Sequence, residues 1–309
     1  MSVPQWNASM KGKVFEGGPS GQGSSDWASW FYCPFKAYAR QHSLGGKDSS
    51  EALDLGSAVH QVEAHHYLRL KARQEGRDPD EWLPPLEAVP AAIAKGVLNP
   101  LTPAALASIE PIYLACHNPN QTRGKKVIAA EAILAIELGT LNCHGHPKHG
   151  EPIIYAPRGD LTEEDENGGI WLSDHKTAGN PSQATIQAYS NHMQFIMLAA
   201  IGEAHYGGKF KGVKLHLIKT SAPYGHDWIP IPITKFQVEA MLWNFQHVAH
   251  QRARFELDIL NGDLNPLHLP RAVNEQVCQG RYSRCSAFDL CRNGSTVKPK
   301  PVSFQRKVR

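Results

Sequence analysis

The spacing of apolar residues divides the chain into a helical first part and a later part in which strands alternate with helices. Between residues 26 and 75 the apolar positions recur at steps of three and four, as on amphipathic helices, and 103–115 is a further predicted helix. Runs rich in Ile, Val, Leu and Trp predict strands at 127–138, 152–161, 169–176 and 212–219. Helical spacing returns at 182–201 and 234–260. Helices thus precede three strands, which are followed by a helix, a strand and a helix.

Two neighbouring predicted strands carry acidic residues close to a lysine. The segment 162–169 is rich in turn formers, so we expect a hairpin that brings Asp160 beside Asp174. Residues two apart on a strand share a face, which places Asp174 and Lys176 together and His175 on the other side. Mg²⁺ and Mn²⁺ favour carboxylate oxygens, and a metal-bound water beside a lysine is a suitable nucleophile for a phosphodiester. Taken alone, an Asp-x-Lys is more often a hairpin with a surface salt bridge.

Further motifs surround this pair. From about Asp26 to Cys291 the chain resembles the PD-(D/E)XK nuclease superfamily, and within it the RecB-like exonucleases. Their Gly-x-x-x-His motif is matched by Gly56 to His60. The Asp that follows a glycine and the D/E-x-K are matched by residues in the expected order, Asp160, Asp174 and Lys176.

Two elements of the family pattern are matched less directly. A glutamate is usual on the first core strand, and Glu131 is the best candidate, with Glu137 weaker. The family also carries Gln-x-x-x-Tyr on a following helix. Here Gln194 is followed by Leu198 at the tyrosine position, so the motif is matched at the glutamine alone.

The resemblance implies an α/β fold, in which a restriction-endonuclease-like mixed central sheet is flanked by helices and extended by an N-terminal helical addition. It also implies hydrolysis of DNA by one or two Mg²⁺ or Mn²⁺ ions. The implied ligands are His60, Asp160, Asp174 and the backbone carbonyl of His175. Lys176 is implied to orient or deprotonate the attacking water, and Glu131 to position Lys176 or a second ion.

Exonuclease action on single-stranded DNA ends is the mode that the resemblance favours. The chain has no P-loop motif, which suggests a phage or mobile-element nuclease of recombination or repair, working in the cytoplasm of a bacterial or phage-infected cell. Two alternatives stay open. One is a structure-specific or sequence-specific endonuclease, and the other is a catalytically silent DNA-binding module. Protein partners cannot be inferred.

The cysteines form a second pattern, because one lies early and three lie close together near the end: Cys33, Cys278, Cys285 and Cys291. This arrangement resembles the iron–sulfur clasp of RecB-like nucleases such as the CRISPR-associated exonucleases, and four thiolates suit a [4Fe–4S] cluster. Zinc also accepts four cysteines, but its structural sites usually show closely paired cysteines. A disulfide framework needs an oxidising compartment, and the N-terminal segment lacks the apolar core of a signal peptide. The two remaining cysteines, Cys116 and Cys143, are expected to be ordinary free thiols.

A compact group of possible ligands follows the first predicted strand: Cys143, His144, His146 and His149. The spacing looks like a zinc loop. So short a run cannot easily arrange all four side chains around one ion, so we favour a solvated hairpin loop.

The composition is consistent with one enzyme domain of 309 residues, because an apolar content of 41% suffices for its core. We expect a disordered lead at 1–25, a single nuclease domain at 26–292 and a basic tail at 293–309. Within the domain, 26–125 is the helical part, 126–260 the nuclease core and 261–292 the cysteine clasp. The net charge of +3 does not by itself indicate nucleic-acid binding, although the tail could contact phosphates. No run of about 18 apolar residues predicts a membrane span.

Overall fold

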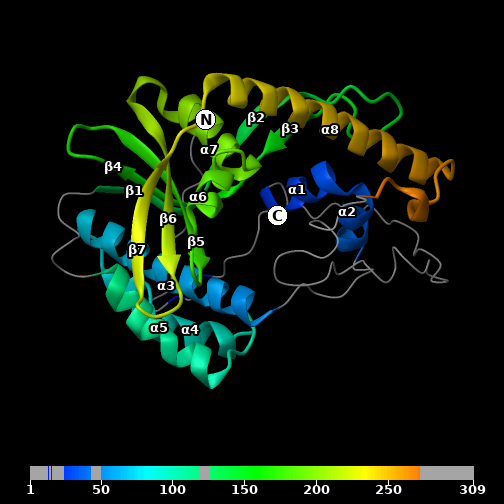
Figure 1. Cartoon of the computed structure of the whole chain (residues 1–309). Helices are drawn as coiled ribbons and strands as arrows, with labels where there is room; N and C mark the ends of the chain where they lie inside the picture. Colours follow the sequence, from blue (N-terminus) through cyan, green and yellow to red (C-terminus); the bar gives the residue numbers. More distant parts are fainter. Residues whose placement is uncertain (1–12, 14, 16–23, 43–49, 118–125, 272–309) are drawn as a thin grey trace. The chain divides into compact units, whose positions relative to one another are not determined.

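The computed structural model describes residues 13, 15, 24–42, 50–117 and 126–271 (Figure 1). The chain forms two compact units, and it passes between them several times. The first unit comprises Met1–Ser20, Glu51–Ile136 and Ala156–Met241. The second comprises Gly21–Ser50, Glu137–Tyr155 and Leu242–Arg309. Among the helices of the described ranges, none has the length and apolar character needed to span a membrane.

The first unit is built on a mixed sheet of five strands, which lie side by side in the order β1-β4-β5-β6-β7. Their bounds are β1 Lys126–Ile133, β4 Arg158–Glu164, β5 Ile170–Ala178, β6 Phe210–Lys219 and β7 Gly225–Ile231. Strands β5 and β6 are parallel and every other pair is antiparallel. A parallel pair needs a crossover connection, which the helices α6 (Gln183–Tyr189) and α7 (Met193–Tyr206) supply.

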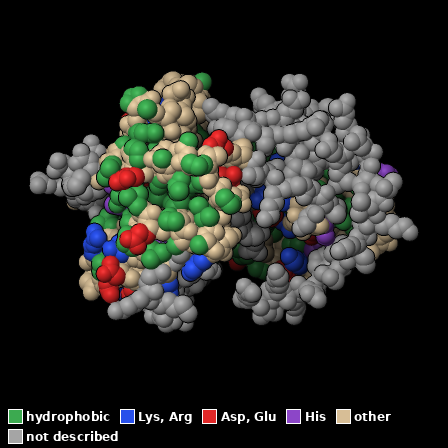
Figure 2. Space-filling view, turned by 90° about the horizontal axis from the view of Figure 1, so that it is seen from below, with side chains coloured by type: hydrophobic (Ala, Val, Ile, Leu, Met, Phe, Trp, Pro, Cys, Tyr) green, Lys and Arg blue, Asp and Glu red, His purple; other side chains and the backbone are tan. Residues whose placement is uncertain are grey.

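Helices cover this sheet on both sides (Figure 1). The helices α3 (Glu51–Gln74), α4 (Pro85–Ala94) and α5 (Pro103–Cys116) share one apolar core, in which Val59, Val89 and Ile112 pack with Ile218 of β6. On the other side α7 is buried from Phe195 to Gly202. Because both faces are covered, the middle of β6 is buried at four successive positions, Leu215 to Ile218. Apolar side chains gather on the face of the molecule seen in Figure 2. Leu106 and Leu114 of α5 are both exposed.

The predicted α/β class is confirmed, with a mixed central sheet flanked by helices as in a restriction-endonuclease-like core. Two predicted strands are wrong in extent, because 127–138 divides into β1 and β2 (Ile136–Thr140), and 152–161 into β3 (Pro152–Tyr155) and β4. Strands β2 and β3 pair with each other in a separate two-stranded sheet. The predicted helix 182–201 is also divided, because His192 caps α7 by accepting the N–H of Gln194 at 3.3 Å.

Strand β7 was not predicted from the sequence. It lies at the edge of the five-stranded sheet, where a residue such as Pro230 is tolerated because a neighbouring strand is present on one side only.

The second unit contains α1 (Ser24–Tyr32), α2 (Pro34–Gln41), the β2–β3 pair and most of α8 (Lys235–Asn261). The fully buried Phe245 of α8 contacts Trp27, with 4.5 Å between ring centroids, and Tyr155, with 5.2 Å. Arg252 binds Asp26 and Glu256 at 3.2 and 2.8 Å. This unit therefore has an aromatic centre bordered by half-buried ion pairs.

The loop between β2 and β3 is only partly solvated, which corrects the expectation from its sequence. His144 and His149 are exposed, but Cys143 and His146 are buried. His146 is held by Glu256 at 3.2 Å from its Nε2 and by the N–H of Lys148, which donates to its Nδ1. These four side chains do not form a group of ligand atoms close enough to hold one ion.

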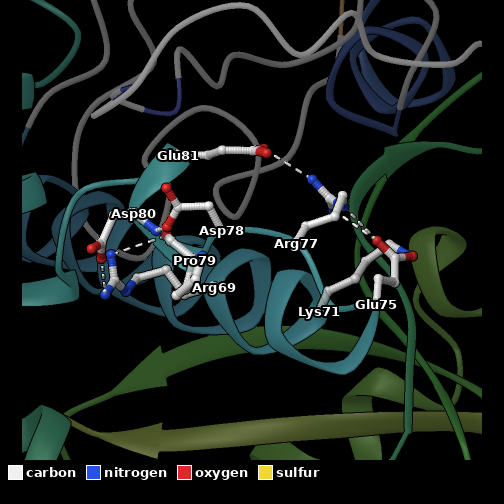
Figure 3. A network of polar contacts seen from close by, with 8 residues as sticks. All are labelled: Arg69, Lys71, Glu75, Arg77, Asp78, Pro79, Asp80 and Glu81. Carbon is white, nitrogen blue, oxygen red and sulfur yellow. Dashed lines mark hydrogen bonds and ion pairs between the residues drawn. The ribbon is translucent and has the colours of Figure 1, made fainter.

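The end of α3 is tied to the segment that follows it by a polar network (Figure 3). Arg69 donates to the carbonyl oxygens of Pro79 and Trp82 at 3.1 and 2.6 Å, and to Asp80 at 2.9 Å. Arg77 binds Glu75 and Glu81 nearer the surface. Exposed ion pairs contribute little, so the bonds from Arg69 to backbone carbonyls are the part of the network that fixes the turn after α3.

His65 ties the early segment of the chain to α3. Its Nε2 accepts the backbone N–H of Phe15 at 3.1 Å, and its Nδ1 lies 3.0 Å from the carbonyl oxygen of Leu83. A backbone N–H can only donate, so the single hydrogen of neutral His65 is on Nδ1 and is donated to Leu83. Burial lowers the pKa of His65 to about 4, against the bond to Leu83, which raises it.

We expect the unfolding free energy to fall as the pH is lowered from about 6.5 towards 4. In this pH window His65 binds a proton in the unfolded chain but not in the folded one. The unfolding free energy should therefore fall by about 1.4 kcal/mol for each pH unit. His65→Leu should flatten this slope, and should cost about 1–3 kcal/mol at pH 7 because two backbone groups lose their partner. Denaturant unfolding from pH 7 to 5 measures both effects. His144→Leu, at an exposed imidazole, is the control, and an unchanged slope in His65→Leu would contradict the assignment.

Candidate active site

The hairpin of β4 and β5 brings the two aspartates together. Asp165 shapes its turn, since its Oδ1 accepts the N–H groups of Asn167 and Gly169. The resulting register pairs Leu161 with Ser173, so that the next pair of positions is Asp160 and Asp174. Asp160 Oδ2 also accepts the backbone N–H of His175 at 2.7 Å. The hairpin expected from the sequence is therefore present, with Asp160 bonded directly to the neighbouring strand.

Asp174 and Lys176 share a face of β5, as the spacing of two residues predicted. They form an ion pair, and the side chain of Asp174 is only 2% exposed. On the same face, Gln194 at the start of α7 donates from Nε2 to Asp174 Oδ1. Leu198, which stands where the family has tyrosine, is buried. The departure at Leu198 therefore leaves the contact between Gln194 and Asp174 in place.

His60 reaches the aspartates from α3. Its Nδ1 lies 3.7 Å from Asp160 Oδ2. The helix comes close to β5 because Gly56 has no side chain, and a Cβ there would lie 2.9 Å from the Oγ1 of Thr177. The two residues of the Gly-x-x-x-His motif thus have linked roles. Gly56 allows α3 to approach β5 closely, and this approach brings His60 near Asp160.

Glu131 occupies the position of β1 across from Asp160, between the pairs Ala130–Leu161 and Ala132–Gly159. Its backbone is left-handed, with φ of 52°, and it is the one non-glycine residue with positive φ in the described ranges. For an L-residue this conformation costs about 1–2 kcal/mol, and such strain is concentrated at functional sites. Glu137 is exposed on β2 and belongs to the second unit. The structure therefore brings Glu131, and not Glu137, to the aspartates.

The site concentrates acidic groups away from water. Burial raises the pKa of Glu131 well above its usual range, and Asp160 adds to this. Burial also raises the pKa of Asp174, which Lys176 opposes. For Lys176, burial would lower the pKa, but the charges of Asp174 and Asp160 outweigh it and raise the pKa. Lys176 is therefore a cation that balances part of the acidic charge.

These residues fit a hard divalent cation. Three carboxyl groups and one imidazole converge from β1, β4, β5 and α3, and burial disfavours the charged forms of Glu131 and Asp174. An ion bound here would favour the charged forms of Glu131 and Asp174.

Three residues near the site were not predicted from the sequence. Arg158 is close enough to Glu131 to lower its pKa, and its guanidinium lies 4.8 Å from the ring centre of Phe15. Tyr189 and His192 lie close enough to Lys176 to interact with its charge. The Arg-Gly-Asp sequence could have indicated Arg158, whereas the other two depend on the break between α6 and α7.

The predicted cluster ligands lie mostly outside the described residues, because only Cys33 falls within them. Cys33 is 6% exposed in the second unit, where its Sγ accepts the N–H of Lys36 at 3.4 Å at the start of α2. Cys278, Cys285 and Cys291 lie beyond residue 271. Cys116 and Cys143 are buried free thiols, as expected.

Comparison with known families identifies the class of protein. Residues 31–291 match the PD-(D/E)XK nuclease superfamily. The chain belongs to this superfamily, whose members are nucleases that use divalent metals. The matched span includes the hairpin, α3 and α7, and so every residue placed in the site above.

Two solved structures are similar over most of their length. A chain from Eubacterium rectale named a "Putative exonuclease" has 14% identity and a TM-score of 0.48, and the match covers 91% of this chain and 90% of that one. A second, named SSO0001, has 14% identity and a TM-score of 0.34, with 85% and 96% covered. Neither likeness bears on the activity of this chain. None of the curated protein sequences matches it.

Proposed function

We propose that the protein is a deoxyribonuclease that uses Mg²⁺ or Mn²⁺ and removes nucleotides from single-stranded DNA ends. The observation that supports a hydrolase best is the convergence of Asp160, Asp174 and Lys176 on one hairpin. A protein that binds DNA without cleaving it would not require two aspartates and a lysine at this position. The preference for DNA ends rests on the RecB-like motif order.

In this proposal His60, Asp160, Asp174 and the carbonyl oxygen of His175 hold the metal. The bound metal supplies a more acidic water and neutralises charge on the phosphate. Gln194 orients Asp174 by donating to Oδ1, which leaves the second oxygen directed to Lys176. The backbone N–H of His175 holds Asp160 Oδ2 in the same way.

Lys176 is the proposed partner of the attacking water. The ammonium group is anchored by Asp174, and 26% of the Lys176 side chain is exposed. It donates a hydrogen bond that orients the water and favours the developing hydroxide. Glu131, across from Asp160, positions Lys176 or a second metal, and its strained backbone holds the carboxyl group at that place.

Replacing Lys176 by methionine should lower cleavage of linear DNA at least 100-fold, while DNA binding and folding stay near those of the wild type. The reason is that the methionine keeps the length of the side chain but cannot donate to the water. Single-turnover cleavage and binding in Ca²⁺ measure the two properties.

Lys214→Met is the matched control. Lys214 on the adjacent strand β6 also pairs with a buried acid, Glu163, at 2.7 Å, but it has no contact with the aspartates among the described residues. This variant should keep its activity. Substantial Mg²⁺-dependent cleavage by Lys176→Met would exclude the proposed role of Lys176.

Linear and circular single-stranded DNA of the same sequence separate the possible modes. An exonuclease should degrade the linear form and leave the circle intact for the same time in Mn²⁺. Cutting of the circle at a comparable rate would indicate the alternative, an endonuclease. Binding of both forms without any cleavage would indicate a silent DNA-binding module.

We also propose that Cys33, Cys278, Cys285 and Cys291 bind a [4Fe–4S] cluster that clasps the two ends of the chain. Ligands so far apart in sequence restrict the unfolded chain strongly, so the cluster should act on stability. The setting is DNA recombination, repair or phage DNA processing in the cytoplasm of a bacterial or phage-infected cell.

Cys285→Ser should remove the iron and the brown colour of anaerobically purified protein and lower its thermal midpoint. Cys143→Ser, at a thiol buried in the β2–β3 loop, should do neither. Iron analysis and thermal unfolding of both variants measure this. Loss of iron in Cys143→Ser but not in Cys285→Ser would contradict the proposed ligands and would indicate Cys143 as a ligand in place of Cys285.

A further inference from the structure

The face of β5 opposite to Asp174 and Lys176 carries a second polar cluster, which is fully buried. His175 of β5 is paired in register with His216 of β6, and Glu63 of α3 lies against both. The exposed fractions are 1% for Glu63, 1% for His175 and 0% for His216. One ligand atom from each of the three lies within 4.8 Å of the others. We call this group the buried triad.

The atoms of the buried triad point at one another. The Nδ1 atoms of His175 and His216 are 2.8 Å apart, and Glu63 Oε2 lies 3.8 Å from Nδ1 of His216. Two side-chain atoms, Oε2 of Glu63 and Nε2 of His175, have no hydrogen-bond partner in the described part of the chain. A buried carboxylate oxygen without a donor is costly, and so is a buried ring nitrogen without a partner. A cation shared by the triad would provide the missing interaction for the carboxylate.

A second layer of contacts orients two of the three side chains. His117 Nε2 lies 2.8 Å from Glu63 Oε1, which leaves Oε2 directed to His216. On the far side of His216, Nε2 lies 2.9 Å from Nδ1 of His226. If His216 carries its hydrogen on Nε2 and donates it to His226, then its Nδ1 lone pair faces Glu63 and His175. Metal-binding histidines and carboxylates are typically held by outer contacts of this kind.

Aromatic rings enclose the cluster. Trp228 stacks on His216 with 3.9 Å between ring centres, and Tyr67 stacks on His175 at 5.6 Å. These rings restrict rotation of both imidazoles and exclude bulk water.

We propose that Glu63, His175 and His216 bind a transition-metal cation of the zinc class. Two imidazole nitrogens and one carboxylate oxygen form a zinc ligand set, whereas Mg²⁺ prefers oxygen ligands and retained waters. Zinc–nitrogen distances are about 2.0–2.1 Å, which in a tetrahedral site places two nitrogens about 3.3 Å apart. The two Nδ1 atoms would therefore separate by about half an ångström, and the ion would replace the hydrogen that they share at 2.8 Å. A water completes the fourth position. This ion is distinct from the one proposed at Asp160 and Asp174, and it does not depend on the nuclease function.

The ion would hold together the elements that build the active site. His175 stands between Asp174 and Lys176 in sequence, and Glu63 lies one helical turn after His60. Binding at the buried triad would therefore link β5, β6 and α3 on the face of β5 opposite to Asp174 and Lys176.

A neighbouring group, Cys116, His216 and His226, shares His216 and is the competing assignment. The buried triad is preferred because it contains a carboxylate with a free oxygen and two nitrogens already aimed at each other. The experiment includes variants of both groups.

The protein is treated with a zinc chelator, incubated with Zn²⁺ alone, and dialysed against metal-free buffer and then against excess Mg²⁺. Zinc is then counted by mass spectrometry, separately from iron. We expect one equivalent of zinc in the wild type and its loss in Glu63→Gln and His216→Gln. Zinc should be retained in three control variants: Asp160→Asn, His146→Gln and Cys116→Ser. These substitutions lie at the proposed catalytic metal site, in the β2–β3 loop and in the competing group, respectively.

Two further measurements keep the test decisive if a variant folds poorly. Zn²⁺ should raise the thermal midpoint of the chelator-treated wild type by several degrees and leave that of Glu63→Gln unchanged. Co²⁺ alone should add the visible absorption of a tetrahedral site to the wild type and not to Glu63→Gln, as a difference spectrum. A wild type that retains no zinc and shows no shift would overturn the proposal. So would loss of zinc in Asp160→Asn or Cys116→Ser with retention in Glu63→Gln.

Discussion

Strand β5 carries three consecutive polar side chains, Asp174, His175 and Lys176, into a sheet that is covered on both faces, and the rest of the first unit is arranged to accommodate them. An acid, an imidazole and an ammonium group cannot be buried without partners except at a cost of several kcal/mol. Their partners come from different elements on each face: α7 supplies Gln194 on one side, while α3 and β6 supply Glu63 and His216 on the other. The two helical layers are therefore required for polar reasons as well as for apolar packing.

The acidic side of β5 gathers three carboxyl groups. Lys176 and Arg158 lie close enough to oppose the effect, but burial raises the pKa of both Asp174 and Glu131. The left-handed backbone of Glu131 adds local strain that the surrounding strands must hold. The fold therefore holds these carboxyl groups together in spite of their mutual repulsion. A divalent cation bound among them would reduce that repulsion.

The sequence predicted the parts of this site that depend on short-range geometry. Alternation along a strand placed Asp174 with Lys176, the turn formers at 162–169 placed Asp160 beside them, and the motif order led to His60 and Glu131. It missed what depends on three-dimensional packing. The chain leaves the main sheet after β1 and returns at β4, and nothing in the apolar runs 127–138 and 152–161 marks the point of departure. Glu63 and His216 are separated by most of the first unit in sequence, so no local pattern connects them.

His175 shows why these long-range contacts matter for the active site. Its backbone N–H holds Asp160 on one side of the strand, and its side chain contacts His216 within the buried triad on the other. Because successive residues of a strand point to opposite faces, a rotation or shift of β5 that disturbed one set of contacts would disturb the other. The register between β5 and β6, which pairs His175 with His216, is thereby tied to the register between β4 and β5, which brings Asp160 to Asp174. The positions of Asp160 and Asp174 are in this way tied to polar contacts on the opposite, buried face of the sheet.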